Sequence, residues 1–292
     1  MIGIIGGTGL GEAFASAEGG KPIEVDTPYG PPSAVPLHFD WQGCDVVFLN
    51  RHGEGHRFSP STVPYRANIF ALKTIGVTTV IASGAVGSLR EEIAPGDLVV
   101  CDQVIDKTFR RAGTFFHDEI AVHLELAEPF CPVLRQRILA QAETVKAKVH
   151  DGGTYVCMEG PQFSTRAESN MHRQWGGDLI GMTTMPEAKL AREAEMSFAL
   201  VALATDYDCW KPHASQNKQA LLAEIMGNLK IATDNAIELI QATVGSLAAD
   251  PITDCAAFSA LELAIWSDKS RVPKRVVDRL KPLLGRYFSD KG

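Results

Sequence analysis

Short apolar runs, each long enough for one buried strand, alternate with helical patterns along most of the chain. The run Val77–Ala82 is rich in β-branched residues, and the stretch before it, Tyr65–Ile75, carries apolar residues at helical spacing. Strands that alternate with helices are covered by those helices on their faces. We therefore expect an α/β fold with a central mixed β-sheet flanked by helices. The expected strands are Ile2–Ile5, Val46–Leu49, Val77–Ala82, Asp97–Ile105, Thr154–Met158, Leu179–Met182 and Phe198–Ala204.

Helical patterns fall between these strands and dominate the end of the chain. The expected helices are Tyr65–Ile75, Pro132–Val149, Ser164–Trp175, Pro186–Glu195 and Lys218–Val244. Beyond Pro251 two shorter helical stretches follow, separated near Pro273. Because no low-complexity linker or internal repeat interrupts the sequence, we expect one domain over residues 1–250. The remaining residues, 251–292, are expected to form a C-terminal helical extension that packs on this domain.

The charge balance and the cysteines narrow the class of protein. Lys and Arg number 28 against 35 Asp and Glu, a net charge of −7, so we expect no nucleic-acid partner. No stretch has the roughly 18 uncharged apolar residues of a membrane helix, and the first residues show no basic leader. We therefore expect a cytoplasmic protein without a membrane partner. The six cysteines are scattered without metal-ligand spacing, which favours buried reduced thiols and no metal site.

Glycine and polar residues follow nearly every expected strand. In open α/β sheets, ligands bind beyond the carboxyl ends of the strands. After the first strand comes Gly6-Gly7-Thr8-Gly9, where the backbone can approach an anion closely and Thr8 adds a donor. After the second comes Arg51-His52, a fork of donors suited to phosphate oxygens. A plain turn and a solvated basic loop are the alternatives to a phosphate site.

The segment after the sixth strand contains a helix-start signal. Thr184 precedes Glu187 by three residues, which fits a capping box with Pro186 in the first helical turn. Thr183 would then be free to face a ligand beside the helix N-terminus. Met182, at the strand tip, packs either in the core or on a ligand.

Asp206 and Asp208 follow the most apolar run of the sequence. In an extended segment, residues two apart point the same way, so both carboxylates would lie on one side. There they could accept hydrogen bonds from an amino-substituted heterocycle or share a proton, and a dry site would raise a carboxyl pKa toward general acid use. The alternative is an acidic turn in which Asp208 caps the next segment.

The order of these motifs along the chain is similar to that of a known family. The sequence resembles the S-methyl-5′-thioadenosine phosphorylases, a trimeric branch of the purine nucleoside phosphorylase family. The similar stretches are GIIGGTGL (3–10), RHGEGH (51–56), YRANIFALK (65–73), GSLREEIAPGDLVVCDQVID (87–106), AEPFCP (127–132), EGPQFSTRAES (159–169), GMTTMPEAKLAREA (181–194) and ATDYDCWKPH (204–213). Together they cover most of residues 1–213.

The resemblance implies a reversible phosphorolysis that serves purine and methionine salvage. Inorganic phosphate, a co-substrate, attacks the anomeric carbon of methylthioadenosine and releases adenine and 5-methylthioribose 1-phosphate. The expected enzyme is a pentosyltransferase and a homotrimer, and it uses no metal and no cofactor. Its catalysis then rests on positioning and on electrostatic stabilisation of the transition state.

The resemblance also implies roles for individual residues. The residues expected to bind phosphate are Thr8, Arg51, His52, Gly84, Ala85 and Thr183. Met182 is expected to pack on the ribose, while Phe163 and Ser164 line the purine pocket. His123 is expected to reach the methylthio pocket of a neighbouring subunit.

The two aspartates set the expected base preference. By resemblance, Asp206 protonates or hydrogen-bonds the purine N7, and Asp208 binds the 6-amino group. A purine nucleoside phosphorylase with a broader or different nucleoside preference is the alternative within the family, although relatives that act on 6-oxopurines have Asn in place of Asp206. A nucleotide-binding dehydrogenase is the alternative from another class. Its glycine loop would be Gly7–Gly11, but the third glycine comes one position too early.

Overall fold

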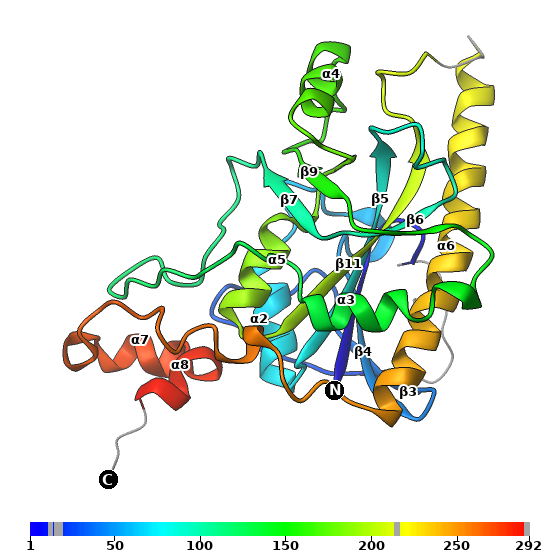
Figure 1. Ribbon diagram of the computed structural model, residues 1–292. Coiled ribbons are helices and arrows are strands. Elements are labelled where there is room, and N and C mark those ends of the chain that lie inside the picture. Colours follow the sequence, from blue (N-terminus) through cyan, green and yellow to red (C-terminus); the bar gives the residue numbers. More distant parts are fainter. Residues whose placement is uncertain (11–13, 15–19, 213–216, 289–292) are drawn as a thin grey trace.

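Four parallel strands form the centre of the sheet: β1 (Ile2–Gly6), β4 (Cys44–Asn50), β5 (Thr79–Ser88) and β11 (Ser197–Asp206). The computed structural model describes residues 1–10, 14, 20–212 and 217–288 (Figure 1). β1 lies between β4 and β5, and β11 runs beside β5 along nearly its whole length. Because all four run in the same direction, their carboxyl ends lie at one edge of the sheet.

Shorter strands extend this centre into a mixed sheet of 11 strands. They are β2 (Lys21–Pro22), β3 (Leu37–Trp41), β6 (Leu98–Val100), β7 (Gln103–Asp106), β8 (Val149–Asp151), β9 (Thr154–Cys157) and β10 (Leu179–Gly181). β5 pairs with β1 over Thr79–Ala82 and, further along, with the antiparallel β10 at Gly87 and Ser88. The expected α/β class with a mixed sheet is therefore confirmed.

Helices cover both faces of the sheet (Figure 1). α2 (Tyr65–Ile75) and α5 (Thr184–Glu193) contribute to one hydrophobic core, and α3 (Pro132–Leu139) and α6 (Lys218–Ala249) contribute to the other. Alternate residues of β11 divide between the two cores. Phe198 and Leu200 face the first, while Ala199 and Val201 face the second. A strand buried on both faces explains why β11 is the most apolar run of the sequence.

The remaining helices are short. They are η1 (Glu54–His56), η2 (Ala142–Thr144), α4 (Arg166–Gln174), η3 (Ala256–Ser259), η4 (Lys269–Arg271), α7 (Lys274–Arg279) and α8 (Lys281–Phe288). Leu280, Leu283 and Leu284 from the last segment of the chain are buried in the first core, together with residues of α2 and α5. In the described parts of the chain, no helix is long and apolar enough to cross a membrane.

Two segments far apart in sequence project together from the side of the molecule (Figure 1). Residues 117–126 and 261–268, which we call the arm, are joined by the bridge between Val122 and Ile265. His123 N–H donates to the Ala264 carbonyl (2.9 Å), and Trp266 N–H donates to the Ala121 carbonyl (3.0 Å). The arm is thus a short two-stranded ribbon whose two halves come from the middle and the end of the chain.

Several expected boundaries were wrong. The predicted strand Asp97–Ile105 is two strands, β6 and β7, which separate at Cys101 and Asp102 and pair with different partners. The predicted helix Pro132–Val149 ends at Leu139, and its last residues begin β8. His213, the last residue of the final motif, lies outside the described residues.

Candidate active site

Two glycines, Gly7 and Gly84, lie where the ends of the central strands meet. A Cβ atom on Gly7 would lie 2.6 Å from Nη1 of Arg51 and 3.3 Å from the Ser83 carbonyl oxygen. One on Gly84 would lie 3.4 Å from Oγ1 of Thr183 and 3.8 Å from the same Arg51 nitrogen. A side chain at Gly7 would clash with Arg51, so the close approach requires glycine there, whereas a Cβ at Gly84 would make ordinary contacts with Thr183 and Arg51. The fold thereby brings together the residues after β1, β4 and β10 around the middle of β5.

We call the residues that meet here, Gly7, Arg51, Gly84 and Thr183, the strand-end cluster. Arg51 is fully buried at its centre. Its Nε and Nη2 donate to the two Glu187 carboxylate oxygens at 2.5 and 2.9 Å, and its Nη1 donates to the Ser83 carbonyl at 2.7 Å. Burial alone would lower the pKa of Arg51, but the Glu187 carboxylate outweighs it, and the pKa lies above its ordinary value. Three of the five guanidinium N–H groups are used in these bonds, which leaves two for an anion.

The capping box predicted for Thr184 and Glu187 was wrong. α5 begins after Thr183, and Glu187 is turned inward to Arg51 rather than back to the helix start. Within the described residues, the Thr184 hydroxyl is buried without a hydrogen-bond partner. A buried guanidinium needs a full opposite charge, whereas a helix N–H needs only an acceptor, so the ion pair takes the carboxylate.

His52 is buried beside this ion pair and is not a cation. Its Nδ1 lies 2.8 Å from the Phe58 carbonyl oxygen. Because a carbonyl only accepts, Nδ1 carries the proton, and Nε2 is left as an acceptor in the neutral ring. Burial, followed by the Arg51 charge, lowers the pKa of His52 to about 4. The ring also stacks on His56, with centroids 4.1 Å apart.

Thr183 is held at the start of α5 by Tyr155. The Thr183 N–H donates to the Tyr155 hydroxyl oxygen at 3.3 Å. That hydroxyl packs so closely on Gly181 that a Cβ there would lie 2.0 Å from it. The Thr183 side chain faces Gly84 across the strand ends. Gly181 is therefore a further positioning residue, which the sequence pattern does not reveal.

Thr8 and Ala85 lie at the same edge in different ways. Thr8 is exposed in the turn after β1, with its side chain open to solvent. Ala85 follows Gly84 on β5, and its methyl group packs against the second core, so its backbone is the portion left for a ligand. The six residues predicted for phosphate thus include two glycine or alanine positions that offer backbone only, one exposed hydroxyl and a buried ion-paired arginine.

Asp206 ends β11 after a register shift. The ladder between β11 and β5 skips a residue after Ala204, so that Asp206 pairs with Gly87. The Thr205 hydroxyl donates to Asp206 Oδ1 at 2.7 Å. Nδ2 of Asn228, on α6, donates to the Thr205 carbonyl at 3.0 Å. A side chain from a long helix thereby fixes the backbone that carries this carboxylate.

Asp208 lies in the turn that follows. The Lys211 N–H donates to its carbonyl at 3.3 Å, so the strict alternation predicted for the two aspartates does not extend to it. A Cβ on Gly87 would lie 3.1 Å from the Asp208 Cβ, which places both aspartates beside the same β5 residue. Among the described residues, its Oδ2 is buried without a hydrogen-bond partner. A carboxylate oxygen held in this way is available to a ligand donor.

Two side chains of α4 belong to the surroundings of Asp208, and sequence reasoning missed both. Ser169 Oγ and His172 Nδ1 are buried, and neither has a partner in the portion of the chain that is described. Lys107 Nζ donates to His172 Nε2 at 3.1 Å, so Nδ1 carries the proton of the neutral ring. Burial, then the Lys107 charge, lowers the pKa of His172, while the Asp208 charge acts in the opposite direction.

The predicted purine wall is open in the single chain. Phe163 is 84% exposed. Its neighbour Ser164 contacts the turn that contains Asp208, because the Ser164 carbonyl accepts a hydrogen bond from the Cys209 thiol at 3.3 Å. Met182 packs on Gly160, where a Cβ would lie 2.5 Å from its sulfur. Ser164 and Met182 therefore contact neighbouring residues of the fold, whereas Phe163 is open to solvent.

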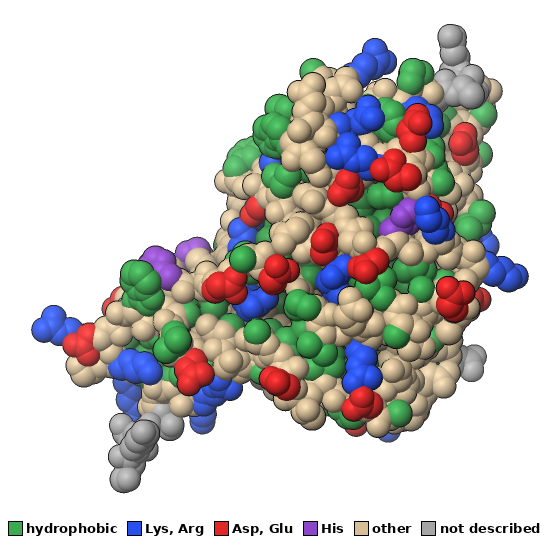
Figure 2. Space-filling model, viewed as in Figure 1, with side chains coloured by type: hydrophobic (Ala, Val, Ile, Leu, Met, Phe, Trp, Pro, Cys, Tyr) green, Lys and Arg blue, Asp and Glu red, His purple; other side chains and the backbone are tan. Residues whose placement is uncertain are grey.

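His123 lies on the arm rather than among the strand ends. It is exposed and packs on Trp266, with ring centroids 4.7 Å apart. Trp266 is itself 72% exposed. Figure 2 shows histidine and hydrophobic side chains side by side on the outer surface of the arm. An exposed aromatic pair on a projecting ribbon has little to contact within its own chain.

Arg111 is a second buried arginine that the sequence did not indicate. Its Nη1 donates to the carbonyls of Met182 and Met185 at 2.5 and 2.6 Å. Its Nε lies 3.3 Å from Glu159 Oε1. Arg111 therefore fixes the backbone on both sides of Thr183. In sequence it follows Arg110 in a loop, where paired cations are ordinarily solvated, so no pattern marks it.

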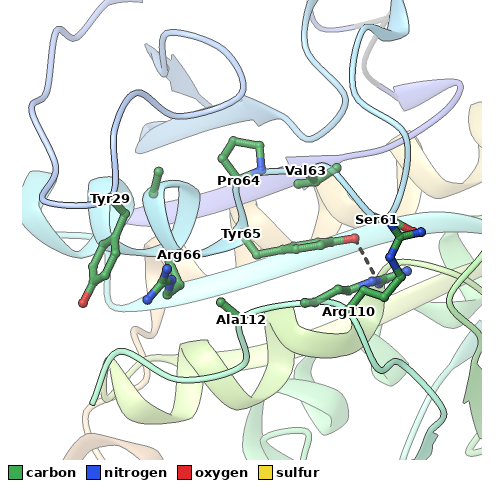
Figure 3. A pocket seen from close by; sticks show the side chains of 10 residues that line it. Tyr29, Ser61, Val63, Pro64, Tyr65, Arg66, Arg110 and Ala112 are labelled. Atoms are coloured by element: carbon green, nitrogen blue, oxygen red, sulfur yellow. Dashed lines mark hydrogen bonds between the residues drawn. The ribbon is translucent and has the colours of Figure 1, made fainter. Parts of the chain in front are cut away.

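A cavity of about 210 Å³ lies beside Arg111 at the start of α2 (Figure 3). Figure 3 shows Tyr65 pointing across it, with its hydroxyl in a 3.2 Å hydrogen bond from Arg111 Nη1. None of the residues predicted for phosphate or purine lines this cavity. It adjoins the candidate site without belonging to it.

Comparisons with known proteins agree over nearly the whole chain. A family model described as the phosphorylase superfamily matches residues 1–245. An S-methyl-5′-thioadenosine phosphorylase of Geobacter sulfurreducens is 46% identical over 292 residues, covering 98% of this chain and 99% of the relative. The crystal structure of a methylthioadenosine phosphorylase from an Antarctic soil metagenomic library superposes with a TM-score of 0.89 at 44% identity, covering 97% and 98% of the two chains. Methylthioadenosine phosphorylase from Schistosoma mansoni in complex with tubercidin gives a TM-score of 0.80 at 34% identity, over 89% and 95%.

Replacing Glu187 tests the buried ion pair. Glu187→Gln keeps the shape but leaves Arg51 uncompensated, so we expect the free energy of unfolding to fall by about 3–5 kcal/mol. Urea unfolding followed by tryptophan fluorescence measures this. Asp250→Asn is the matched control, because the Arg137–Asp250 pair is exposed and should contribute under about 1 kcal/mol. Equal losses in the two variants would contradict a structural role for the Glu187 charge.

His52 should make the protein less stable in acid. Its folded pKa of about 4 lies below the ordinary 6.5, so between these pH values the unfolded state binds the extra proton. Its contribution is favourable above about pH 6.5 and is lost by about pH 4. We expect the stability of the wild type relative to His52→Gln to fall by about 3 kcal/mol over this range, measured by urea unfolding at each pH. His38→Gln, on partly exposed β3, is the control, and an equal pH slope there would refute the assignment.

Proposed function

The chain belongs to the S-methyl-5′-thioadenosine phosphorylases of the phosphorylase superfamily, and we propose on that premise that it catalyses the reversible phosphorolysis of S-methyl-5′-thioadenosine. The products would be adenine and 5-methylthioribose 1-phosphate, which makes the enzyme a pentosyltransferase. One observation supports this most directly. A buried arginine after β4 and a buried carboxylate oxygen after β11, the latter without a partner among the described residues, lie beside Gly84 and Gly87 of β5.

We propose that phosphate binds at the cluster around Arg51. The two unused N–H groups of Arg51, the Thr183 and Thr8 hydroxyls, and the backbone at Gly84 and Ala85 supply donors. His52, neutral with Nε2 free of the proton, would accept a hydrogen bond from a protonated phosphate oxygen. Phosphate is the co-substrate here, and we propose no metal or cofactor.

The reaction follows from placing phosphate opposite the purine. A phosphate oxygen forms a bond to the anomeric carbon as the bond from that carbon to the purine nitrogen breaks. The ribose passes through an oxocarbenium-like state, and the departing purine gains electron density. Asp206, in its protonated form, would donate a hydrogen bond or its proton to N7, which makes adenine a better leaving group. Holding phosphate and nucleoside in line lowers the entropy cost of their encounter.

Asp208 would read the base. Its Oδ2, which has no partner among the described residues, can accept from the exocyclic amine of adenine, whereas the carbonyl of a 6-oxopurine would face it with a second acceptor. Sites built to bind a donor reject analogues that lack it, because a buried polar group is then left unpaired. Ser164 would lie along the purine, and Met182 would pack on the ribose.

We propose that the active enzyme is a homotrimer in which His123 completes a neighbour's methylthio pocket. Two observations support an assembly: the exposed His123–Trp266 pair on the arm, and Phe163, which is 84% exposed beside the purine site. Three chains of 31.6 kDa give 3 × 31.6, about 95 kDa, which light scattering on the eluted protein would detect. A monomer mass would refute the shared site.

The division of the chain and its location are also proposals. The phosphorylase domain would span residues 1–250, to which the family match over residues 1–245 lends support, and residues 251–292 would be an extension of it. We place the protein in the cytoplasm.

The proposed activity is tested by base release. Purified protein is incubated with phosphate and, in parallel, methylthioadenosine, adenosine, methylthioinosine or inosine, and free base is measured by chromatography. We expect phosphate-dependent adenine release to be fastest from methylthioadenosine. Equal turnover of adenosine would give a broader adenine-nucleoside phosphorylase, and no release from any of the four would refute the proposal.

Asp208→Asn tests base recognition. The amide can donate to a 6-oxo group and no longer presents a charge to the amine. We expect kcat/KM for methylthioadenosine over methylthioinosine to fall at least about tenfold, equivalent to ~1.4 kcal/mol. Asp234→Asn, an exposed residue on α6 paired with Lys230, is the control and should leave the ratio unchanged. An unchanged ratio in Asp208→Asn would exclude this residue from base selection.

A further inference from the structure

Cys131 and Cys255 lie in contact in the interior of the protein. Their sulfur atoms are 2.8 Å apart, although the residues are 124 positions apart in sequence. Cys131 is 2% exposed and Cys255 is 7% exposed. In the described parts of the chain, no other cysteine lies within hydrogen-bond distance of a second thiol. Cys44, Cys101, Cys157 and Cys209 each meet a backbone carbonyl instead.

The surroundings of Cys131 favour its thiolate. It is the N-cap of α3, with Pro132 in the first turn, and the N–H groups of Val133 and Leu134 favour its charged form. Ser197 Oγ is fully buried without a hydrogen-bond partner among the described residues, and its hydroxyl favours the thiolate as well. These contacts, the one with Cys255 first, lower the pKa of Cys131 to about 6.

We propose that Cys131 and Cys255 are a redox pair that closes to a disulfide when the protein meets a peroxide. The sulfurs need to approach by only about 0.8 Å to reach bonding distance. The pair belongs neither to the strand-end cluster around Arg51 nor to the turn that contains Asp208. This inference therefore does not depend on the proposed reaction.

The chemistry balances with hydrogen peroxide as the two-electron oxidant. The Cys131 thiolate attacks one peroxide oxygen, the O–O bond breaks, and water leaves after protonation, which gives a sulfenic acid. The Cys255 sulfur then attacks the Cys131 sulfur, the S–O bond breaks, and a second water leaves with the Cys255 proton. Two thiols are oxidised to one disulfide, and one peroxide is reduced to two waters.

The disulfide would join the two chain segments that connect the arm to the rest of the protein. Cys131 follows the first half of the arm, and its N–H donates to the Phe198 carbonyl of β11 at 2.8 Å. Cys255 precedes the second half and begins η3. Closing this link forms a ring of more than a hundred residues and restricts the unfolded chain, so the disulfide should stabilise the protein against heat.

Peptide mapping of the full-length protein tests the pair. After treatment with hydrogen peroxide, alkylation and digestion without reductant, we expect one cross-linked species containing Cys131 and Cys255, lighter by two hydrogens than the two reduced peptides. Denatured protein should then titrate four thiols, six minus two, and return to six after reduction with a dithiol. The oxidised form should unfold at a temperature higher by about 5 °C or more.

Variants assign the sulfurs. Cys131→Ser should abolish the cross-link and leave Cys255 free to be alkylated, whereas Cys44→Ser, a half-buried cysteine without a thiol neighbour among the described residues, should leave the cross-link intact. The wild-type peptide map stands even if Cys131→Ser does not fold. The proposal is overturned if peroxide oxidises Cys44 or Cys209 while Cys131 and Cys255 both remain alkylatable. Oxidation of Cys131 to a sulfinic acid without a cross-link also overturns it.

Discussion

The buried ion pair of Arg51 and Glu187 is the interaction on which the strand-end cluster depends. It joins the segment after β4 to α5, and through the Ser83 carbonyl it reaches the middle of β5. A fully buried guanidinium needs its carboxylate, and a Cβ at Gly7 would lie only 2.6 Å from Arg51 Nη1, so the pair also depends on glycine at this position. Arg111 has a similar role further from the cluster, since it holds the backbone around Thr183.

In the proposed site, this arrangement would also set the charge that an incoming phosphate meets. Arg51 is neutralised at rest by Glu187, and His52 is uncharged because its pKa is about 4. In the proposed site, attraction would therefore come from N–H and O–H groups rather than from a surplus of positive charge. Those of Arg51 and Thr183 are buried, where hydrogen bonds to an anion are strong, whereas Thr8 is exposed. An acidic protein can bind phosphate in this way without a basic surface.

Much of the fold could be predicted from sequence, because buried parallel strands and amphipathic helices leave clear periodic patterns. The strand ends likewise indicated where polar residues gather. What failed were features set by tertiary contacts. Glu187 has the spacing of a capping residue, but its carboxylate binds Arg51 instead. β6 and β7 come from one apolar run of the sequence but pair with different strands. The register shift before Asp206 is also invisible in the alternation, since it arises where β11 meets β5. Arg111, Gly181 and His172 had no local signal, because each acts through residues distant in sequence.

The pairing of β5 with three neighbours has a further consequence. Gly84 lies in the strand-end cluster. Gly87, three residues further along the same strand, lies beside both aspartates. At about 3.3 Å per residue, the two ends of the site are separated by roughly 10 Å of continuous backbone. β5 thus sets the distance between these two groups of residues. A single residue inserted into β5 would turn every later side chain to the opposite face, so this distance cannot be increased by one residue at a time. In the proposed site, β5 would therefore hold the distance between phosphate and base constant. A longer or shorter substrate would then have to be accommodated by changes in the residues that line the site.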